Sequence, residues 1–447
     1  MRRAFTSLSY KFDLVTIGFK KDAPYTWSMK SPIFERTRAI PKHSAELRAE
    51  GLYLYMRKLE SSSEARVTVN GQELLMFASN NYLGLTTHPK VKAAALAALE
   101  KYGVGAGSVR LLGGTFGIHE ELERRIAAFK GTEAAIAYSS GYVSNLATLS
   151  TLLNKNEDIA IVDEKIHASL LDGLRFAQIP FRVFDHNDMP DLEAKLSASQ
   201  NKGNLIVIVD GVYSMDGDVS PLPQIKPLAE KYGALVMVDD AHGSGVMGPH
   251  GRGTPEHFGL HGQMDIIQGT FSKGLGGIGG FAAGPADLIT TLKHQARGFV
   301  FSAALPPSTC AGLIAAMDVI EKESFWLTRL HENANLMRKG LQQMGYDTGH
   351  SVSAIIPVIV KEDLTVFQLT RTLHALGIYV SPVAYPAVKR GSARLRVSVM
   401  ATHTHDDILK ALQAFEKALK LVPGLPRPSE KSSSPTSVER NELQSAA

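Results

Sequence analysis

Residues 234–245 read ALVMVDDAHGSG, where five apolar residues end abruptly in two aspartates, a histidine and a glycine-containing turn. A short apolar run closed by turn-forming residues is typical of a strand that is buried on both faces. Similar polar segments follow the apolar runs at 205–209 and 265–269, where the chain continues as DGVYSMDGD and TFSKG. Open α/β sheets bind ligands outside the carboxyl ends of their strands. We therefore expect these polar segments to meet in one crevice.

Short apolar runs and helical stretches alternate along the middle of the chain. In the segment HEELERRIAAFKG, Leu122, Ile126 and Phe129 recur on one helical face, and Gly131 ends the helix. Strands are predicted at Ala134–Tyr138, Ile159–Val162, Arg182–Phe184, Leu205–Val209, Ala234–Val238, Asp265–Gly269 and Phe281–Ala283. This alternation predicts an α/β fold with a large, mostly parallel sheet that helices cover on both faces.

Four segments are expected along the chain. Residues 1–65 are predicted to form an N-terminal arm with a helix over 44–59, and residues 66–307 a large domain. Residues 308–421 are predicted to form a smaller α+β domain, with strands at Ile355–Val360, Ile378–Ser381 and Arg394–Val399. The tail 422–447 is rich in proline, serine and charge, and we expect it to be disordered.

The composition describes an ordinary globular protein. Of 447 residues, 44% are hydrophobic and 21% are charged, with a formal net charge of +4, which argues against disorder and against nucleic-acid binding. Cys310 is the single cysteine, so an intrachain disulfide or a cysteine-based metal site is excluded, and no metal is expected. The start of the chain has no clean signal sequence, and no run of 18 apolar residues occurs. We expect a cytoplasmic protein.

The polar segments hold the groups that a pyridoxal 5′-phosphate site requires. The cofactor's aldehyde needs an amine, and Lys273 follows a strand end beside hydroxyl groups. Its ring nitrogen stays protonated beside a buried carboxylate, for which Asp239 is placed, and His167 can cover the ring face. Taken singly, each has an ordinary interpretation, because a lone lysine is usually a surface group and an aspartate after a strand is often a turn residue. Their joint occurrence at strand ends favours the cofactor site.

The cofactor's phosphate calls for backbone N–H groups at a helix N-terminus and for small hydroxyls. Ser140, Gly141 and Tyr142 provide the first, and Thr270 and Ser272 provide the second. Two further histidines, His119 and His403, are predicted to be structural.

A glycine pattern at 274–279 formally matches G-x-G-x-x-G, the dinucleotide-binding fingerprint. The residues about 20 positions further on should include an acid for the ribose, but KHQARGFVFSAAL at 293–305 holds none. These glycines are interpreted instead as sites of close packing beside Lys273. The sequence also has no G-x-S-x-G, Walker A or H-E-x-x-H pattern, which excludes the commonest hydrolase, nucleotide and zinc-protease classes.

Taken together, these segments resemble the α-oxoamine synthases, a family of fold-type I pyridoxal phosphate enzymes. The resemblance runs from about residue 75 to 421, through FASNNYLGL, RLLGGTFGIHEELE, YSSGYVSNL, DEKIHASLLDG, DGVYSMDGD, VDDAHGSGVMG, GTFSKGLGGIGGF and LRVSVMATHT. It implies a fold-type I transferase with a large sheet domain and a small C-terminal domain. It also implies a homodimer with active sites at the subunit interface.

The resemblance assigns a role to each candidate around the cofactor ring. Lys273 would form the Schiff base, Asp239 would pair with the pyridine nitrogen and His167 would stack on the ring. His242 and Ser214 would lie near the phenolic oxygen.

It also assigns residues to the phosphate and the substrate. Thr270 and Ser272 would hold phosphate, with Ser302 contributed from the partner subunit. Arg396 would bind the substrate carboxylate, which suits a planar guanidinium. Asn80 would face the neighbouring subunit's site.

The implied reaction joins an amino acid to an acyl thioester with loss of CO2, with coenzyme A or an acyl carrier protein as the donor. The segments SPVAYPAV, VSVMATHT and HNDMPDL look most like bacterial serine palmitoyltransferases, which favours serine and a long-chain acyl group. RGTPEHFGL resembles 8-amino-7-oxononanoate synthases, which use alanine and a pimeloyl group, and Ser108-Val109-Arg110 resembles the glycine-using ligases. Sphingolipid or biotin biosynthesis and a peripheral membrane contact are the corresponding expectations. Outside the family, an aminotransferase, an amino-acid lyase and a catalytically silent partner subunit stay open.

Overall fold

The structure is a computed structural model and describes residues 32–385 and 387–425. These residues divide into two compact units, of which the first comprises residues 32–53 and the second begins at Leu54. The predicted arm before residue 32 and the predicted tail beyond residue 425 lie outside the described residues. In the described part, no helix is both long enough and apolar enough to span a membrane.

The first unit holds two helices, α1 (Pro32–Glu35) and α2 (Ala39–Ala49). The predicted helix over 44–59 is therefore wrong in its second half. Gly51 adopts a left-handed conformation with φ of 66° directly after α2, which ends the helix.

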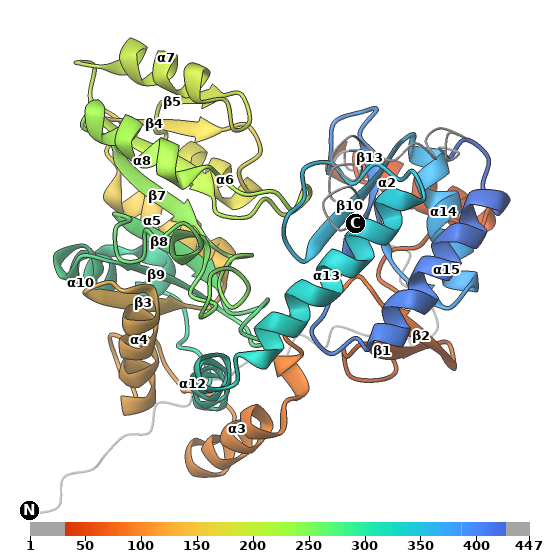
Figure 1. The fold of residues 1–447 in the computed structure, drawn as a ribbon. Helices are drawn as coiled ribbons and strands as arrows, with labels where there is room; N and C mark the ends of the chain where they lie inside the picture. The colour runs from red at the N-terminus through yellow and green to blue at the C-terminus, as the bar shows by residue number, and fades with distance from the viewer. Residues whose placement is uncertain (1–31, 386, 426–447) are drawn as a thin grey trace, which may run out of the picture. The chain divides into compact units, whose positions relative to one another are not determined.

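A seven-stranded sheet forms the large part of the second unit, in the order β3-β9-β8-β7-β6-β4-β5 (Figure 1). Its strands are β3 (Ala134–Tyr138), β4 (Asp158–Asp163), β5 (Phe181–Phe184), β6 (Asn204–Asp210), β7 (Leu235–Asp239), β8 (Ile266–Thr270) and β9 (Gly280–Gly284). β9 runs antiparallel to both of its neighbours, β3 and β8, whereas the pairs among β8, β7, β6, β4 and β5 are parallel. Every strand predicted for this sheet is present within one residue of its expected ends, which confirms the mostly parallel α/β fold.

Helices cover both faces of this sheet, because alternate residues of each buried strand point to opposite faces. One face packs against α4 (Gly117–Lys130), α7 (Met189–Ser199), α8 (Leu222–Lys231) and α12 (Pro307–Lys322). The other packs against α5 (Gly141–Leu152), α6 (Ala168–Phe176), α10 (Ala286–Gln295) and the short α11 (Arg297–Val300). Along β6, for example, Val207 and Val209 join the first core, whereas Ile206 and Ile208 join the second. As predicted, Gly131 ends α4, with φ of 69°.

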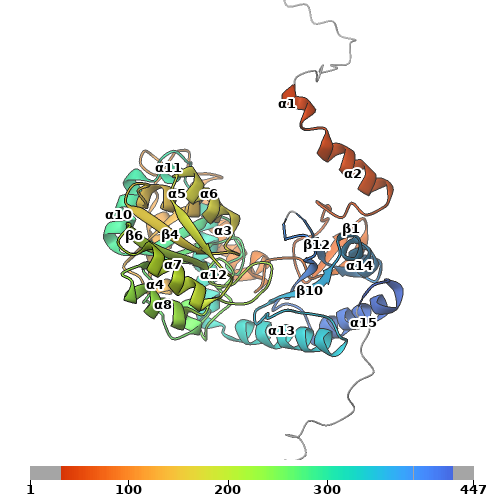
Figure 2. The same cartoon turned by 90° about the horizontal axis from the view of Figure 1, so that it is seen from above.

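The C-terminal part is α+β, as expected. Its elements are β10 (Ile355–Lys361), α14 (Asp363–Ala375), β11 (Ile378–Tyr379), β12 (Ser381–Val383), β13 (Ala393–Ser398) and α15 (His405–Leu421). The long helix α13 (Phe325–Gln343) runs towards this part and lies beside α15 (Figure 2). Strands β10, β13 and β12 form one antiparallel sheet.

The single strand predicted at Ile378–Ser381 is wrong, because β11 and β12 belong to different sheets. Between them, the backbone oxygen of Val380 lies 2.9 Å from Nε2 of His374. This side chain satisfies the backbone where the chain passes from one sheet to the other.

A hairpin before the large sheet joins the C-terminal part in space. Strands β1 (Arg66–Val69) and β2 (Gln72–Met76) are linked by Asn70-Gly71, both with positive φ, and β2 pairs in parallel with β11. A division of the chain at residues 66, 308 and 422 remains a prediction. The other elements of the second unit are the 3-10 turn at Leu85–Thr87, α3 (Pro89–Tyr102) and α9 (Thr254–His257).

Candidate active site

The carboxyl ends of β6, β7 and β8 meet the N-terminus of α5 around a cavity of about 280 Å³. This is the crevice that the polar segments after these strands predict. The cavity is lined by Ser140, Gly141, Tyr142, Asn145, His167, Ser169, Asp210, Val212, Asp239, Ala241, His242, Gly269, Thr270, Ser272 and Lys273.

Lys273 lies in the loop that follows β8. Burial lowers the pKa of its ammonium group to about 8, with Asp239 and Asp210 opposing the shift and Arg396 adding to it. About a tenth of the amine is therefore neutral at pH 7, and more at mildly alkaline pH, which suits a nucleophile or a base. The glycines that follow allow close packing, as predicted: a Cβ on Gly277 would lie 2.7 Å from Cδ2 of Leu313. No helix follows these glycines, which is inconsistent with a dinucleotide-binding fingerprint.

Asp239 is the last residue of β7 and its side chain is buried beside α5. Oδ2 accepts a hydrogen bond of 2.7 Å from Nδ2 of Asn145, and Oδ1 accepts one of 3.1 Å from the backbone N–H of Ala241. Both bonds orient the carboxylate at the floor of the cavity. The sequence analysis did not identify Asn145, although an asparagine inside the apolar stretch of α5 is a signal that could have pointed to it.

His167 is the N-cap residue of α6, at the mouth of the same cavity. Its Nδ1 lies 2.7 Å from Oγ of Ser169 and also accepts the backbone N–H of Ser169, at 3.3 Å. Ser169 Oγ in turn accepts a bond of 2.9 Å from Asn145, so its hydroxyl proton is free to go to His167. This arrangement leaves Nε2 of His167 to carry the ring proton. Loss of hydration lowers the pKa of His167, with Lys273 contributing, so the ring is neutral at pH 7.

The part of the cavity formed by the start of α5 is suited to an anion. Helix α5 begins there, and its N-cap residue Ser140 accepts the backbone N–H of Val143 at 3.1 Å. Thr270 and Ser272 lie beside this end, with their hydroxyl oxygens 2.9 Å apart. A Cβ on Gly141 would lie 2.9 Å from Cβ of Thr270, so glycine is needed for the backbone to come this close.

A second polar network joins His242 to Arg396. Nδ1 of His242 lies 2.7 Å from the hydroxyl of Tyr82, which also accepts a bond of 3.2 Å from Arg396. Arg396 donates further bonds to Oδ1 of Asn80 at 3.0 Å and to the carbonyl oxygen of Ser214 at 2.6 Å. Burial lowers the pKa of His242 well below its usual range, and Lys273 and Arg396 add to this. Tyr82 is a second residue that the sequence analysis did not identify.

Four predicted residues are not among those that line the cavity of Lys273, and the first of them is Arg396, whose contacts are given above. Asn80 contacts Arg396 of its own chain, and its predicted place at the partner subunit's site stays a prediction. Ser214 presents its carbonyl group to Arg396, and the residue lines a neighbouring cavity of about 680 Å³ rather than that of Lys273. Ser302 lies near His119 in another small cavity, and its predicted role in a partner subunit's site stays a prediction.

His119 and His403 are structural, as predicted. Both are buried, and each uses Nδ1 to accept a backbone N–H and Nε2 to donate to a backbone carbonyl. No ring nitrogen of either histidine is left for a ligand.

Pyridoxal 5′-phosphate fits the residues around the cavity. A buried carboxylate, a helix N-terminus with hydroxyl groups, and a lysine of lowered pKa all line this one cavity. Fold and site together define a pyridoxal phosphate enzyme of fold type I.

Comparison with known proteins agrees with this class of enzyme. The family model "Aminotransferase class I and II" matches residues 72–415, and the chain belongs to this family. An 8-amino-7-oxononanoate synthase of Thermoanaerobacter pseudethanolicus is 44% identical over 85% of this chain and 96% of its own length. A serine palmitoyltransferase of Sphingobacterium spiritivorum is 42% identical over 84% of this chain and 94% of its own length. The solved structure of a serine palmitoyltransferase variant from S. paucimobilis, with bound PLP-myriocin aldimine, has a TM-score of 0.85, 33% identity, and covers 88% of this chain and 100% of its own.

Within the family, the chain is an α-oxoamine synthase, a pyridoxal phosphate-dependent C-acyltransferase that uses an amino acid and an acyl thioester. The expected fold, family, cofactor and type of reaction are thereby confirmed. The hypotheses of an aminotransferase, an amino-acid lyase or a catalytically silent subunit are not needed to explain the fold and the site.

Proposed function

We propose that the chain condenses L-alanine with a pimeloyl thioester, with loss of CO2, as an 8-amino-7-oxononanoate synthase. The convergence of Lys273, Asp239 and His167 on one cavity carries the chemistry. The relative at 44% identity supports alanine and a pimeloyl group over the serine and long-chain acyl group that the sequence first favoured.

Lys273 is proposed as the residue that holds the cofactor and moves the proton at the α-carbon of the amino acid. When bound, the cofactor supplies an electron sink that stabilises negative charge at that carbon. Its ring nitrogen must stay protonated for this purpose, and we assign that task to Asp239, which Asn145 and Ala241 hold in place. With a pKa of about 8, Lys273 can accept and return the proton at mildly alkaline pH.

The two histidines are proposed to act as neutral hydrogen-bonding groups. His167 covers the ring face, and its Nε2–H is available to the substrate carboxylate or the thioester carbonyl, because Ser169 occupies Nδ1. His242 is proposed to lie near the phenolic oxygen, with its Nδ1 held 2.7 Å from the hydroxyl of Tyr82. In both cases the lowered pKa favours the uncharged ring, which is a donor without being a strong acid.

The remaining contacts are divided between the phosphate and the substrate carboxylate. Ser140, Gly141 and Tyr142 at the start of α5, with Thr270 and Ser272, are proposed to bind phosphate. Arg396 is proposed to bind the carboxylate, with Asn80 and Ser214 orienting its guanidinium.

Assembly and location complete the proposal. A homodimer would bring Ser302 of one subunit to the phosphate of the other. Cytoplasmic location is supported by a single, buried cysteine. A carrier-protein donor and a peripheral membrane contact are retained as proposals.

The decisive experiment presents the purified holoenzyme with L-alanine, L-serine and glycine, each paired with pimeloyl-CoA, palmitoyl-CoA and the corresponding carrier-protein thioesters. We expect L-alanine to change the absorbance of the bound cofactor, and pimeloyl thioester then to be consumed with release of thiol and CO2. Mass spectrometry should find the alanine-derived amino ketone. Efficient turnover of serine with palmitoyl-CoA, and none of alanine with pimeloyl thioesters, would reject this substrate pair.

Serine with a long-chain acyl thioester is the second candidate. It is favoured by the TM-score of 0.85 to a serine palmitoyltransferase variant structure. The same assay separates the two candidates through their products, which differ by the serine hydroxymethyl group and by acyl length.

A further inference from the structure

The segment HNDMPDL begins with His186, which no role assigned above uses. His186 follows β5 at the edge of the large sheet, and its side chain is only 13% exposed. Its ring lies edge-on against Tyr213, with a centroid distance of 4.4 Å and an interplanar angle of 88°.

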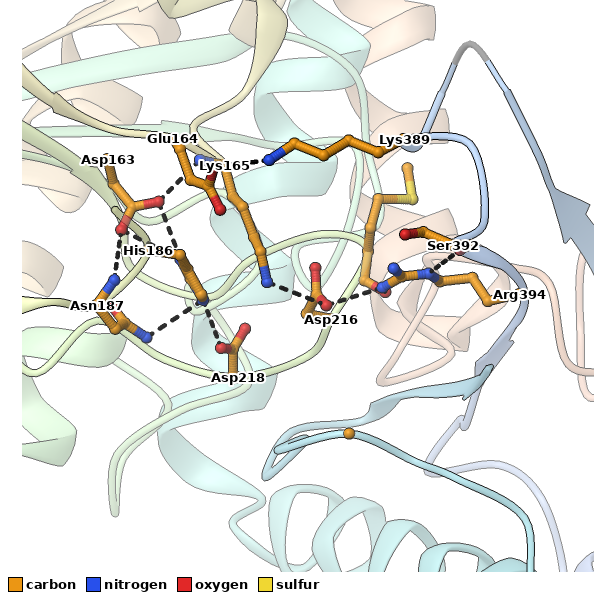
Figure 3. Close-up of polar contacts among 12 residues, drawn as sticks. Asp163, Glu164, Lys165, His186, Asn187, Asp216, Asp218, Lys389, Ser392 and Arg394 are labelled. Atoms are coloured by element: carbon orange, nitrogen blue, oxygen red, sulfur yellow. Dashed lines mark hydrogen bonds and ion pairs between the residues drawn. The ribbon is translucent and has the colours of Figure 1, made fainter. Parts of the chain in front are cut away.

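His186 is held between two carboxylates that come from different segments. Nδ1 lies 2.9 Å from Oδ1 of Asp163, at the end of β4, and Nε2 lies 2.7 Å from Oδ2 of Asp218 (Figure 3). Both ring nitrogens face acceptors, so both must carry a proton to make both bonds. Burial lowers the pKa of His186, but the hydrogen bonds and charges of Asp163 and Asp218 outweigh this and raise the pKa to about 9.

The two carboxylates differ in their other partners. Asp163 also accepts the backbone N–H groups of Lys165 at 2.8 Å and Asn187 at 2.9 Å, so it is anchored without His186. Asp218 has no such support, and its Oδ1 is buried without a hydrogen-bond partner among the described residues. The position of the Asp218 carboxylate therefore depends on His186.

Asp218 closes the loop 211–219, which reaches from the large sheet to β13. At the base of this loop, the backbone N–H of Tyr213 donates to the carbonyl oxygen of Asp218 at 3.0 Å. At its tip, Ser214 accepts a bond from Nε of Arg396 at 2.6 Å, and Asp216 accepts one from Arg394 at 2.8 Å. Figure 3 shows Asp216 between Lys165 and Arg394, with which it forms ion pairs.

We infer that His186 is a positioning residue for amino-acid binding: the charged imidazole ties Asp218 to Asp163, fixes the loop 211–219, and so orients Arg396 through the carbonyl of Ser214. This inference rests on the proposed role of Arg396 as the group that binds the substrate carboxylate. His186 itself does not line the cavity of Lys273.

A neutral imidazole can donate from only one nitrogen, so loss of the proton breaks one of the two bonds. The groups that face the ring among the described residues are Asp163, Asp218, Asn187 and Tyr213. None is a cation, so the imidazolium is favoured until the pH approaches 9. Above that pH, the loop should loosen and amino-acid affinity should fall.

The test compares wild-type holoenzyme with His186→Gln and with a matched control, His250→Gln, across pH 7–10. His250 also pairs with a carboxylate, Glu256 at 2.8 Å, but it is exposed and takes no part in the hydrogen bonds described for the loop 211–219. The Kd of the amino acid is read from the absorbance change of the bound cofactor, and kcat is read at saturating substrate. For His186→Gln at pH 7.5 we expect a Kd raised roughly tenfold, kcat within about twofold, and unchanged cofactor affinity.

The pH profile separates positioning from a purely structural role. The ratio of the variant Kd to the wild-type Kd should fall towards one as the pH rises through 9, because wild type then loses the same proton. His250→Gln should match wild type throughout. A ratio that stays constant with pH, or a folded His186→Gln protein with wild-type Kd, would overturn the inference.

A second variant covers the case in which His186→Gln fails to fold. Asp218→Asn keeps an oxygen for Nε2 but removes one charge, so the pH at which Kd rises should move below the wild-type value. An unmoved profile would overturn the inference. Amino-acid binding precedes the thioester step, so the Kd can be measured even if no thioester is turned over. The absence of thioester turnover would reject the proposed function, whereas the Kd tests the inference about His186.

Discussion

Replacing Tyr82 by phenylalanine removes one hydroxyl group at the centre of the network between His242 and Arg396. Tyr82 is 1% exposed, and burial raises the pKa of its hydroxyl group despite the nearby Arg396, so the group is neutral in the assay. The change leaves Nδ1 of His242 and one N–H of Arg396 without their partner. A lost bond to a charged group of this kind costs about 1.5–3 kcal/mol.

Part of this cost should appear as weaker amino-acid binding, because Arg396 keeps only its bonds to Asn80, Ser214 and Ser398. We expect the Kd for L-alanine to rise roughly tenfold, which corresponds to about 1.4 kcal/mol. Spectral titration of the holoenzyme measures this Kd, and thermal unfolding measures the accompanying loss of stability.

Tyr346→Phe is the matched control. Tyr346 is also buried and donates to the carbonyl oxygen of Phe415 at 3.0 Å, but it takes no part in the network of Arg396. The Tyr346→Phe substitution should lower the Tm without changing the Kd for L-alanine. If Tyr82→Phe behaves in the same way as Tyr346→Phe, the proposed coupling between Tyr82 and substrate binding is refuted.

Three further predictions concern buried groups. Lys273→Met should stabilise the cofactor-free protein by up to about 3 kcal/mol below pH 8, because the folded pKa of about 8 lies below the usual lysine value. This gain should vanish as the pH rises from 8 to about 10.5. Urea unfolding at several pH values measures it, and a gain that stays constant with pH would contradict the prediction. Asn145→Ala removes the hydrogen bonds to Asp239 and Ser169 and should weaken cofactor binding roughly tenfold. Equilibrium dialysis measures this affinity, and unchanged binding would contradict the role given to Asp239. Lys130→Met leaves the buried carboxylate of Asp240 without its partner at 2.7 Å, and it should lower the free energy of unfolding in urea by about 3–5 kcal/mol. Adding Asp240→Asn should recover part of that loss. A Lys130→Met variant as stable as wild type would show that the pair is not buried in solution.

The sequence by itself determined the large sheet and the chemical identity of the site. Its strands were predictable because each is a short apolar run between turn residues, a local pattern that burial on both faces imposes. Lys273, Asp239, His167 and Thr270 were predictable because they lie at or shortly after strand ends, and parallel strands bring their carboxyl ends to one edge. The end of α2 and the splitting of 378–381 were not predicted, because the backbone conformation of Gly51 and the contact of the His374 side chain with Val380 decide them.

Only the tertiary structure decided which side chains orient the catalytic groups. Asn145 meets Asp239 across 94 positions, and Tyr82 meets His242 across 160 positions of the chain. His186 reaches Arg396 only through Asp218 and a loop whose path no local pattern specifies. Hydrogen bonds between residues so far apart depend on the packing of whole helices and strands. They therefore appear only when the chain is folded.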